Sequence, residues 1–526
     1  MVNKNRHVYC KTIMTHPEPL LRIRTDPFHR PNAIVIGAGL GGLSAAMRLG
    51  AKRYQVDIID RLDRLGGRGS SVSQNGYRFD LGPTILTVPE VFERLWSECG
   101  GTFRDDVTVK PLDPYYEIRW PDGSRFQIRN EEADMLAEVE RMFPKDRAGY
   151  LKFLQDCEKR YQFGFEGLGR KPMHRLWDLA KEIPGFVRLR ADRSVYAHAS
   201  ARVKDPRFRM ALSFHPLFIG GDPRHVTSMY ILVSHLEKAF GVHYVQGGVQ
   251  ALADAMGRFA ERQGARISLG TTVDEITVKD RRVTGVTLSD GRHIAADLVV
   301  SNADPGWTYD KLLRKAPRKR WNNAKLARAR WSMGLFVWYF GTRGTRNQWS
   351  DVGHHTIING PRYRGLLGDI FDKVTLADDM SLYLHRPSVT DPSVAPAGDD
   401  CFYALSPVPN LKSKNPVDWA QEKDVYLEKM RTVLNGVIPG FSEKIAAQHV
   451  LTPMDFESRY LSPHGAGFSL EPRIFQSAWF RPHNISEDFD NLYLVGAGTH
   501  PGAGIPSVVT SSEVLTQLVP SVTGAR

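Results

Sequence analysis

The sequence predicts an α/β protein built around a Rossmann-type domain. Three features of residues 32–60 predict it: a short apolar run, a glycine-rich turn with G-x-G-x-x-G spacing, and a second apolar run that ends in an acid. This order is typical of a βαβ unit whose first turn opens a helix. The chain has 526 residues. That is more than a single hydrophobic core usually holds, so we expect two or three domains.

The first elements lie in the stretch NAIVIGAGLGGLSAAMRLG, which begins at residue 32. A buried strand is expected at 33–36, followed by Gly37, Gly39 and Gly42 and then a helix. The first glycine permits a tight turn, the second lets the backbone approach a pyrophosphate, and the third lets helix and strand pack closely. A second strand ends at Asp60, whose carboxylate can accept hydrogen bonds from ribose hydroxyls. This βαβ unit therefore predicts a dinucleotide site.

The next segments extend this site. RLDRLGGRGSS at 61–71 contains a second glycine pair, and Gly67 of that pair is followed by Arg68. Arginine is permanently charged and can fork onto phosphate. GYRFDLGPTILTVPE at 76–90 places Gly82 and Pro83 after a short strand, where the backbone can lie close to a flat ring. The two stretches favour an extended dinucleotide that carries a large ring system.

The middle of the chain predicts further strands and no bilayer span. Residues 264–303 alternate in polarity, turn at Asp290–Gly291 and end in a buried strand at 297–300. WSMGLFVWYF at 331–340 is much shorter than the ~20 apolar residues that cross a membrane, so we expect a buried strand there.

Several longer stretches resemble one known family. After GGR and FDLGP come HHTIINGPRYR at 354–364, SLYLHRPSVTDPSVAP at 381–396 and GFSLEPRIFQSAWFRPHN at 467–484. The chain then nearly ends with NLYLVGAGTHPGAGIPSVV at 491–509. Together these stretches resemble the amine-oxidase-type flavoproteins and, within them, the bacterial carotenoid (phytoene) desaturases, over roughly residues 32–518.

The resemblance implies FAD as cofactor and a fold in which three sequence segments share one FAD-binding domain. The last strand would end at Gly496 and Gly498, against the isoalloxazine. A helix beginning near Gly504, Ile505 and Pro506 would point its free N–H groups at the flavin and favour its reduced anion. The backbone near Val273 would hold the adenine.

The fold class predicted is therefore α/β: a Rossmann-type FAD-binding domain, discontinuous in sequence, a mixed α+β substrate domain, and a helical membrane-associating or lid region. The expected segments are an N-terminal extension at 1–31, FAD-binding parts at 32–90, 241–304 and 466–520, and substrate-domain parts at 91–240 and 305–465.

The activity implied is FAD-dependent desaturation of phytoene, an apolar C40 carotenoid, towards neurosporene- or lycopene-type products, with oxygen or a quinone as electron acceptor. Another flavoprotein of the same fold, such as a carotenoid isomerase, a diapophytoene or hydroxycarotenoid desaturase or an amine oxidase, stays open, as does a non-catalytic lipid-binding protein. By the resemblance, Asp178 aligns with a proposed catalytic acid, although Lys181 stands where an arginine partner is expected. His215, Glu471 and His354–His355 are expected to be structural.

Charge suggests where the protein acts. The net charge is +12 and the pI about 9.4, which favours an acidic partner. KLLRKAPRKRWNNAKLARAR at 311–330 has no acid, and its basic residues surround Trp321. We expect it to dock on anionic lipid, placing the protein in the cytoplasm on the inner face of the cell membrane. Nothing else supports nucleic-acid binding, and a homo-oligomer is left open.

The cysteines and the N-terminus add little. Cys10, Cys99, Cys157 and Cys401 are scattered, which predicts neither a metal site nor an iron–sulfur centre and suits a reducing cytoplasm. The first thirty residues lack the apolar stretch of a signal peptide, and Met14 offers an alternative start.

Overall fold

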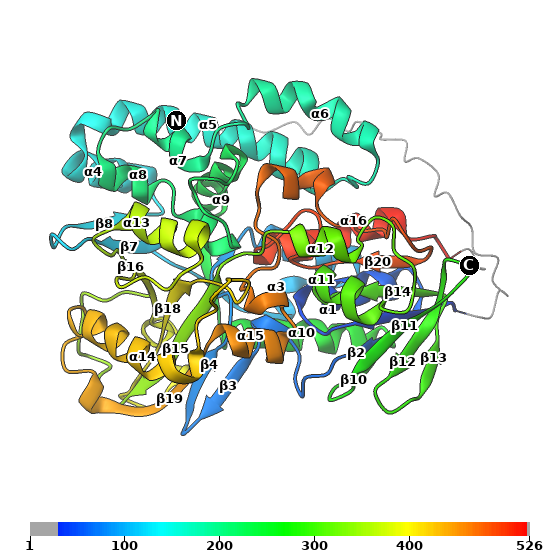
Figure 1. Cartoon of the computed structure of the whole chain (residues 1–526). Helices are drawn as coiled ribbons and strands as arrows, with labels where there is room; N and C mark the ends of the chain where they lie inside the picture. Colours follow the sequence, from blue (N-terminus) through cyan, green and yellow to red (C-terminus); the bar gives the residue numbers. More distant parts are fainter. Residues whose placement is uncertain (1–29, 523–526) are drawn as a thin grey trace, which may run out of the picture.

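The computed structural model describes residues 30–522 (Figure 1). Residues 1–29, which include most of the expected N-terminal extension with Cys10 and Met14, lie outside the described residues, as do residues 523–526.

A five-stranded parallel sheet forms the centre of the dinucleotide domain. Its order is β10-β2-β1-β14-β20. Neighbouring strands are in parallel register, with Ala33 opposite both Val56 and Leu298. The strands are β1 (Asn32–Ile36), β2 (Gln55–Ile59), β10 (Arg266–Ser268), β14 (Leu298–Ser301) and β20 (Leu492–Leu494). The sheet thus draws its strands from three parts of the chain that are far apart in sequence.

Both faces of this sheet are covered, which explains the continuous apolar runs of its strands. Ala33 and Val35 pack towards the helices α1 (Leu40–Ala51), α10 (Gly248–Arg262) and α16 (Ile505–Leu518). Ile34 and Ile36 pack towards a three-stranded meander on the other face. The meander consists of β11 (Val273–Lys279), β12 (Arg282–Leu288) and β13 (His293–Ala295).

A seven-stranded mixed sheet forms the centre of the second part of the molecule, at the left of Figure 1. Its order is β19-β15-β18-β17-β16-β7-β8, and only β16 and β7 pair in parallel. The strands are β7 (Tyr116–Arg119), β8 (Arg125–Ile128), β15 (Gly334–Thr342), β16 (His355–Ile358), β17 (Leu382–His385), β18 (Asp400–Val408) and β19 (Ile445–Leu451). The apolar run that was expected to be a strand is β15, and all its residues are buried.

The helix α14 (Trp419–Asn435) packs on one face of this sheet, and the core on the other face includes α4 (Glu132–Met142), α5 (Arg147–Arg160), α7 (Val195–Ser200) and α8 (Pro206–Ala211). The helices α2 (Glu90–Glu98) and α3 (Phe103–Asp106) pack instead in the core of the dinucleotide domain. The 91–240 region also contains α6 (Leu176–Arg188) and α9 (Leu232–Phe240). Shorter helices are α11 (Pro305–Trp307), α12 (Asn323–Arg328), α13 (Tyr363–Leu367) and α15 (Pro453–Tyr460). The remaining strands are β3 (Ser71–Gln74), β4 (Tyr77–Asp80), β5 (Leu86–Thr87), β6 (Val109–Pro111) and β9 (Val242–Val245).

The helix α6 lies outermost, at the top of Figure 1. Within residues 30–522, no helix combines the length and apolar character that crossing a bilayer requires.

Candidate active site

The first glycine loop joins β1 to α1 and is shaped by its lack of side chains. Gly37 has φ +96°, which favours glycine. A Cβ on Gly39 would lie 2.9 Å from Asn302 Nδ2, and one on Gly42 would overlap the carbonyl oxygen of Gly37. Gly39 is also the N-cap of α1 and supplies no side-chain cap, so the helix N-terminus keeps free donors for a phosphate.

Asp60 lies at the end of β2, 8% exposed, on the wall of the same cavity. Its carboxylate accepts hydrogen bonds from the N–H groups of Ala38 at 2.6 Å and Leu62 at 2.8 Å. Burial raises the pKa of Asp60. Because a carboxylate offers about four acceptor positions, Asp60 keeps capacity for the ribose hydroxyls that the sequence assigns to it.

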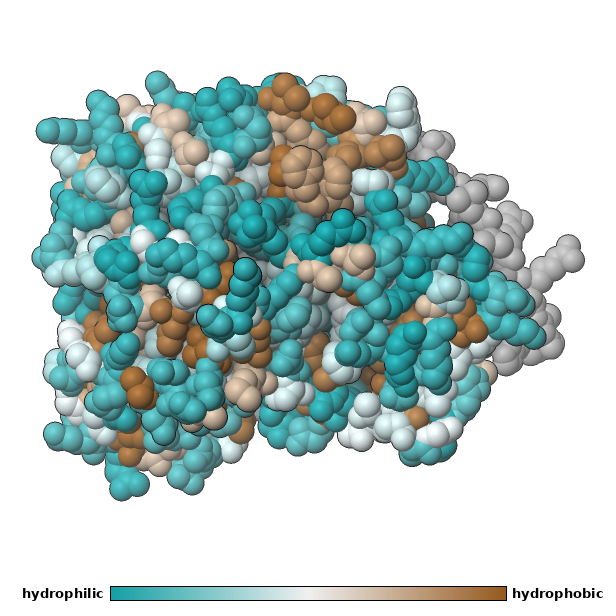
Figure 2. All heavy atoms as spheres, in the orientation of Figure 1, coloured by the Kyte–Doolittle hydropathy of each residue, from teal (hydrophilic) through white to brown (hydrophobic). Residues whose placement is uncertain are grey.

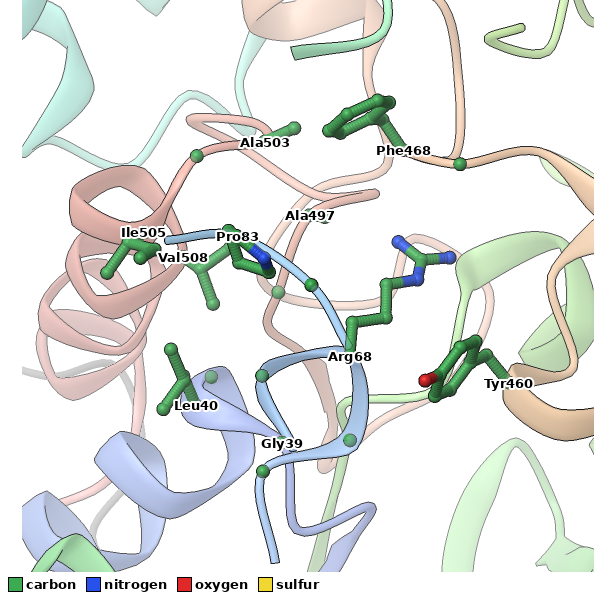
Figure 3. A pocket seen from close by; sticks show the side chains of 18 of the residues that line it. Gly39, Leu40, Arg68, Pro83, Tyr460, Phe468, Ala497, Ala503, Ile505 and Val508 are labelled. Carbon is green, nitrogen blue, oxygen red and sulfur yellow. The ribbon is translucent and has the colours of Figure 1, made fainter. Parts of the chain in front are cut away.

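The second glycine pair is held against the first loop. Gly66 N–H donates to the carbonyl of Ala38 at 2.8 Å, and Gly66 and Gly67 have positive φ angles of +99° and +56°. Arg68 follows and projects into the cavity (Figure 3). Its guanidinium donates to Ser462 Oγ.

Arg68 tests whether an anionic cofactor fits this cavity. Burial lowers its pKa, the charge of Asp304 partly opposes this shift, and no carboxylate among residues 30–522 forms a direct ion pair with it. A guanidinium without a bonded counter-charge in a desolvated wall is costly, and phosphate is the anion that its planar fork matches. Together with the free donors at Gly39, Arg68 makes the cavity suited to a pyrophosphate.

The C-terminal glycines meet the Gly82–Pro83 turn at another part of the cavity. Gly504 is the N-cap of α16, with φ +105° and no side-chain cap. A Cβ there would meet only Ile219 Cγ2, at 3.8 Å, so the space in front of Gly504 is cavity. Pro83 and Ile505 both line the cavity (Figure 3), and β5, which follows Pro83 in the chain, contacts α16. A flat ring bound here would face the N-terminus of α16, whose partial positive charge favours a negative ring.

The structure brings the predicted cofactor residues together around one cavity of about 400 Å³. Its wall includes Gly37, Gly39, Asp60, Gly67, Arg68, Gly82, Pro83, Val273, Gly496, Gly498, Gly504, Ile505 and Pro506. Gly42 is the exception, because it packs beneath the loop against Gly37. Assignment of each residue to a part of FAD stays a prediction.

Away from the glycine loops the cavity wall is mainly apolar. Leu217, Phe218, Val233, Leu335 and Val337 are among the residues that line it. Such a wall binds hydrocarbon by burying it.

Two polar groups interrupt this apolar wall, and sequence reasoning did not assign either to the site. In one, His215 Nε2 lies 2.9 Å from Glu237 Oε2, and Tyr116 donates to Glu237 Oε1 at 2.8 Å. In the other, Thr84 Oγ1 lies 3.2 Å from the hydroxyl of Tyr383 and 3.0 Å from that of Tyr403. These residues are distant in sequence, and no local motif indicated that they would meet.

Asp178 lies in α6 and is not among the residues that line the cavity. Its carboxylate accepts a hydrogen bond from the N–H of Arg175 at 3.1 Å, the contact of a capping box that stabilises the helix start. Its assignment as a catalytic acid stays a prediction. Glu471, expected to be structural, is 2% exposed and bonded to Arg473 Nε at 2.8 Å.

The comparisons with known proteins agree with this geometry. The family model of flavin containing amine oxidoreductases matches residues 40–513. The chain is 62% identical, over 494 residues, to a phytoene desaturase (neurosporene-forming) of Cereibacter sphaeroides, covering 94% of this chain and 95% of that protein. The chain belongs to the phytoene desaturases of the flavin-containing amine oxidoreductases.

Other relatives fit the same family. A neurosporene-forming phytoene desaturase of Rhodobacter capsulatus is 60% identical, covering 93% of this chain and 94% of that protein. A lycopene-forming phytoene desaturase of Paracoccus sp. is 41% identical, and the match covers 93% of this chain and 97% of that protein. Membership of this family makes the chain an FAD-dependent oxidoreductase.

Solved structures share the fold. An oxidoreductase from Methanosarcina mazei superposes with a TM-score of 0.63 at 17% identity, covering 92% of this chain and 100% of that chain. Wild-type putrescine oxidase bound to putrescine superposes with a TM-score of 0.58 at 13% identity, covering 93% of this chain and 98% of that chain. At such identities the likeness concerns architecture alone.

Proposed function

We propose that this chain is a desaturase that introduces double bonds into phytoene, with a neurosporene-type product. The observation that carries the proposal is the cavity itself, in which donors for a dinucleotide open onto an apolar wall. The relatives at 62% and 60% identity are named as neurosporene-forming phytoene desaturases, which supports phytoene as substrate and neurosporene as product. A lycopene-forming relative is less similar, at 41% identity.

The chain's own residues act mainly by binding and positioning. Bound FAD supplies the acceptor for a hydride from carbon. Arg68 and the Gly37–Gly39 loop would hold its pyrophosphate, and the N-terminus of α16 would favour negative charge on its ring. The apolar wall holds the polyene and excludes water. Oxygen or a quinone takes the electrons on.

Pigment analysis in cells that accumulate phytoene tests this function. We expect expression of the chain to convert phytoene mainly into neurosporene, with Gly39→Val as an inactive control whose side chain would occupy the place of the pyrophosphate. Unchanged phytoene despite a folded, FAD-containing protein would contradict the proposal. Lycopene as the main product would support desaturation of phytoene and contradict neurosporene as the product. Comparing air with an anaerobic quinone mixture identifies the electron acceptor.

We also propose that the protein docks on an anionic membrane through α6. Trp177 is 67% exposed and Val187 66%, and Phe475 nearby is 74% exposed. Figure 2 shows this apolar patch at the top of the molecule, where Figure 1 places α6. The exposed cations of Lys171 and Lys181 flank it. Aromatic and aliphatic side chains with flanking lysines suit the headgroup boundary of an anionic bilayer.

Docking through the 311–330 segment, as expected from its composition, is less well supported than docking through α6. Arg314 forms an ion pair with Asp274 at 2.6 Å, and Lys315 one with Glu275 at 2.5 Å. Trp321 is 3% exposed and packs in the core beside the meander, so it is not available to insert into lipid. Its neighbours therefore offer less free charge to a membrane than the sequence suggested.

A vesicle-binding experiment distinguishes docking through α6 from docking through residues 311–330. Replacing Trp177 and Val187 with Glu should reduce binding to phosphatidylglycerol-containing vesicles by tenfold or more, because each buried side chain contributes about 1.5–3 kcal/mol. The matched control is Arg314→Glu with Lys315→Glu, which we expect to change binding less. If the control loses binding and the α6 variant keeps it, the basic segment is the docking site instead.

A further inference from the structure

A chain of hydrogen bonds leads from the cavity wall to a buried histidine. It begins at Thr84, which follows Pro83 at the flavin end of the cavity. The Thr84 hydroxyl contacts that of Tyr383, and the Tyr383 hydroxyl lies 2.6 Å from His355 Nδ1. Tyr383 is 6% exposed and His355 2%. Tyr383 thus joins the cavity wall to an imidazole that lies behind it.

The reaction requires such a group. When two neighbouring C–H bonds become C=C, one hydrogen leaves with its electron pair as the hydride that the flavin accepts. The other leaves as a proton, and its bonding pair becomes the new π bond. The hydrocarbon itself has no basic atom to take this proton. The wall must therefore offer a base close to the flavin end.

We propose that Tyr383 and His355 together accept this proton. In this step the Tyr383 oxygen takes the proton from the substrate carbon while its own hydroxyl proton moves to His355 Nδ1. Thr84 holds the Tyr383 hydroxyl towards the cavity. The step rests on the proposed desaturation of a hydrocarbon. It leaves the hydride, with its two electrons, on the flavin.

The surroundings of His355 suit a transient proton carrier. Burial and the neighbouring His354 and His385 hold the pKa of His355 well below its usual range. The ring is therefore neutral before the reaction, so that it can accept a proton. Its protonated form is disfavoured, so that it gives the proton up again when the electrons leave for the acceptor. His355 Nε2 is buried and has no hydrogen-bond partner among the described residues, so the proton leaves again through Tyr383, by the route it entered.

The other acid–base groups in the wall are less suited. Asp60 and Asp304 lie at the dinucleotide end of the cavity. Glu237 is engaged by His215 at one carboxylate oxygen and by Tyr116 at the other, although a carboxylate keeps further acceptor positions. Glu237 is the strongest alternative, and it belongs in the test.

The experiment compares Tyr383→Phe and His355→Gln with a matched control, Tyr426→Phe. Tyr426 is buried like Tyr383, but its hydroxyl lies 2.7 Å from Ser406 Oγ and it is not among the residues that line the cavity. The FAD-loaded proteins are mixed anaerobically with phytoene in liposomes, and reduction of the flavin is followed by absorbance. FAD content and flavin reduction potential are measured for each variant.

We expect Tyr383→Phe and His355→Gln to slow flavin reduction by about 10²-fold, the usual scale for loss of a general base, with FAD content and potential unchanged. Tyr426→Phe should stay near wild type. Phytoene deuterated at the carbon that loses the proton should show a larger isotope effect in Tyr383→Phe, because proton loss then limits the rate. A merely structural hydroxyl would not change that isotope effect.

Three results would overturn the proposal. Tyr383→Phe could react as fast as Tyr426→Phe, Glu237→Gln alone could show the slow rate and enlarged isotope effect, or a stoichiometric metal could be found that His355→Gln loses. A metal-bound imidazole cannot take the proton. Reduction of wild-type flavin by phytoene tests the proposed function separately, since it does not depend on the Tyr383 result.

Discussion

Replacing Gly504 with alanine tests whether the start of α16 faces the cofactor. Gly504 has φ +105° and ψ 143°, a region that side chains rarely adopt, so the backbone strain of an alanine there costs about 1–3 kcal/mol. The added methyl meets no protein atom closer than Ile219 Cγ2 at 3.8 Å. It therefore projects into the space that we assign to the flavin. The variant combines a strain effect with a cofactor effect.

A matched glycine separates these two effects. Gly440 also has a positive φ, +72°, and a Cβ there would meet no atom within 4 Å. It lies between α14 and β19 and is not part of the cavity wall. Gly440→Ala should lower the free energy of unfolding by about 1–2 kcal/mol, as a left-handed alanine does, and leave FAD binding intact.

The assay combines denaturant unfolding with titration of the apoprotein by FAD, followed through flavin fluorescence. Both variants should lose unfolding free energy. Only Gly504→Ala should also lose FAD affinity, by tenfold or more, which corresponds to about 1.4 kcal/mol. Equal FAD affinity in the two variants would refute the reasoning. Gly504→Glu extends the test, because a carboxylate beside the reduced flavin should lower its reduction potential, and an unshifted potential would mean that the glycine only turns the chain.

Two further predictions concern charge. Arg68→Met should weaken FAD binding by about 1.5–3 kcal/mol, the range for hydrogen bonds to charged groups, and flatten its salt dependence in titrations at low and high salt. The control variant Arg64→Met removes an arginine that is paired with Asp63 and should leave FAD binding and its salt dependence unchanged. Burial raises the pKa of Asp80 to about 7. The folded protein therefore binds a proton more tightly than the unfolded chain, and wild type should lose about 1.4 kcal/mol of unfolding free energy per pH unit between about pH 4 and 7. Asp80→Asn removes this loss, so the unfolding free energy of the variant relative to wild type, measured in denaturant titrations, should increase from pH 5 to pH 8. A difference between variant and wild type that does not change with pH would contradict the raised pKa of Asp80.

Local backbone requirements made the cofactor loops predictable from the sequence. The spacing of Gly37, Gly39 and Gly42 encodes contacts between atoms a few residues apart, and the structure shows the crowding that it implied. The position of β20 beside β14 has no such local signal. It was reached through the resemblance of the final stretch to a known family, which carries information on long-range pairing.

Pairing across the chain made other features unpredictable. The segment at 311–330 contains no acid of its own, so its composition suggested free positive charge. The partners of Arg314 and Lys315 lie 40 residues earlier, on β11, and only the fold brings them near. Trp321 was likewise placed at a surface by its neighbours in sequence, whereas the packing beside the meander buries it.

The same reasoning explains why a base for a hydrocarbon substrate leaves little trace in a sequence. An ionised carboxylate in an apolar wall is costly unless it is paired, and a paired one is less free to accept a proton. A tyrosine hydroxyl backed by a neutral imidazole carries no charge before the reaction, so the wall stays suited to hydrocarbon. Tyr383 and His355 come from adjacent strands, β17 and β16, and meet through sheet register rather than through a motif. Chemistry of this kind becomes visible only when the pairing of the strands is known.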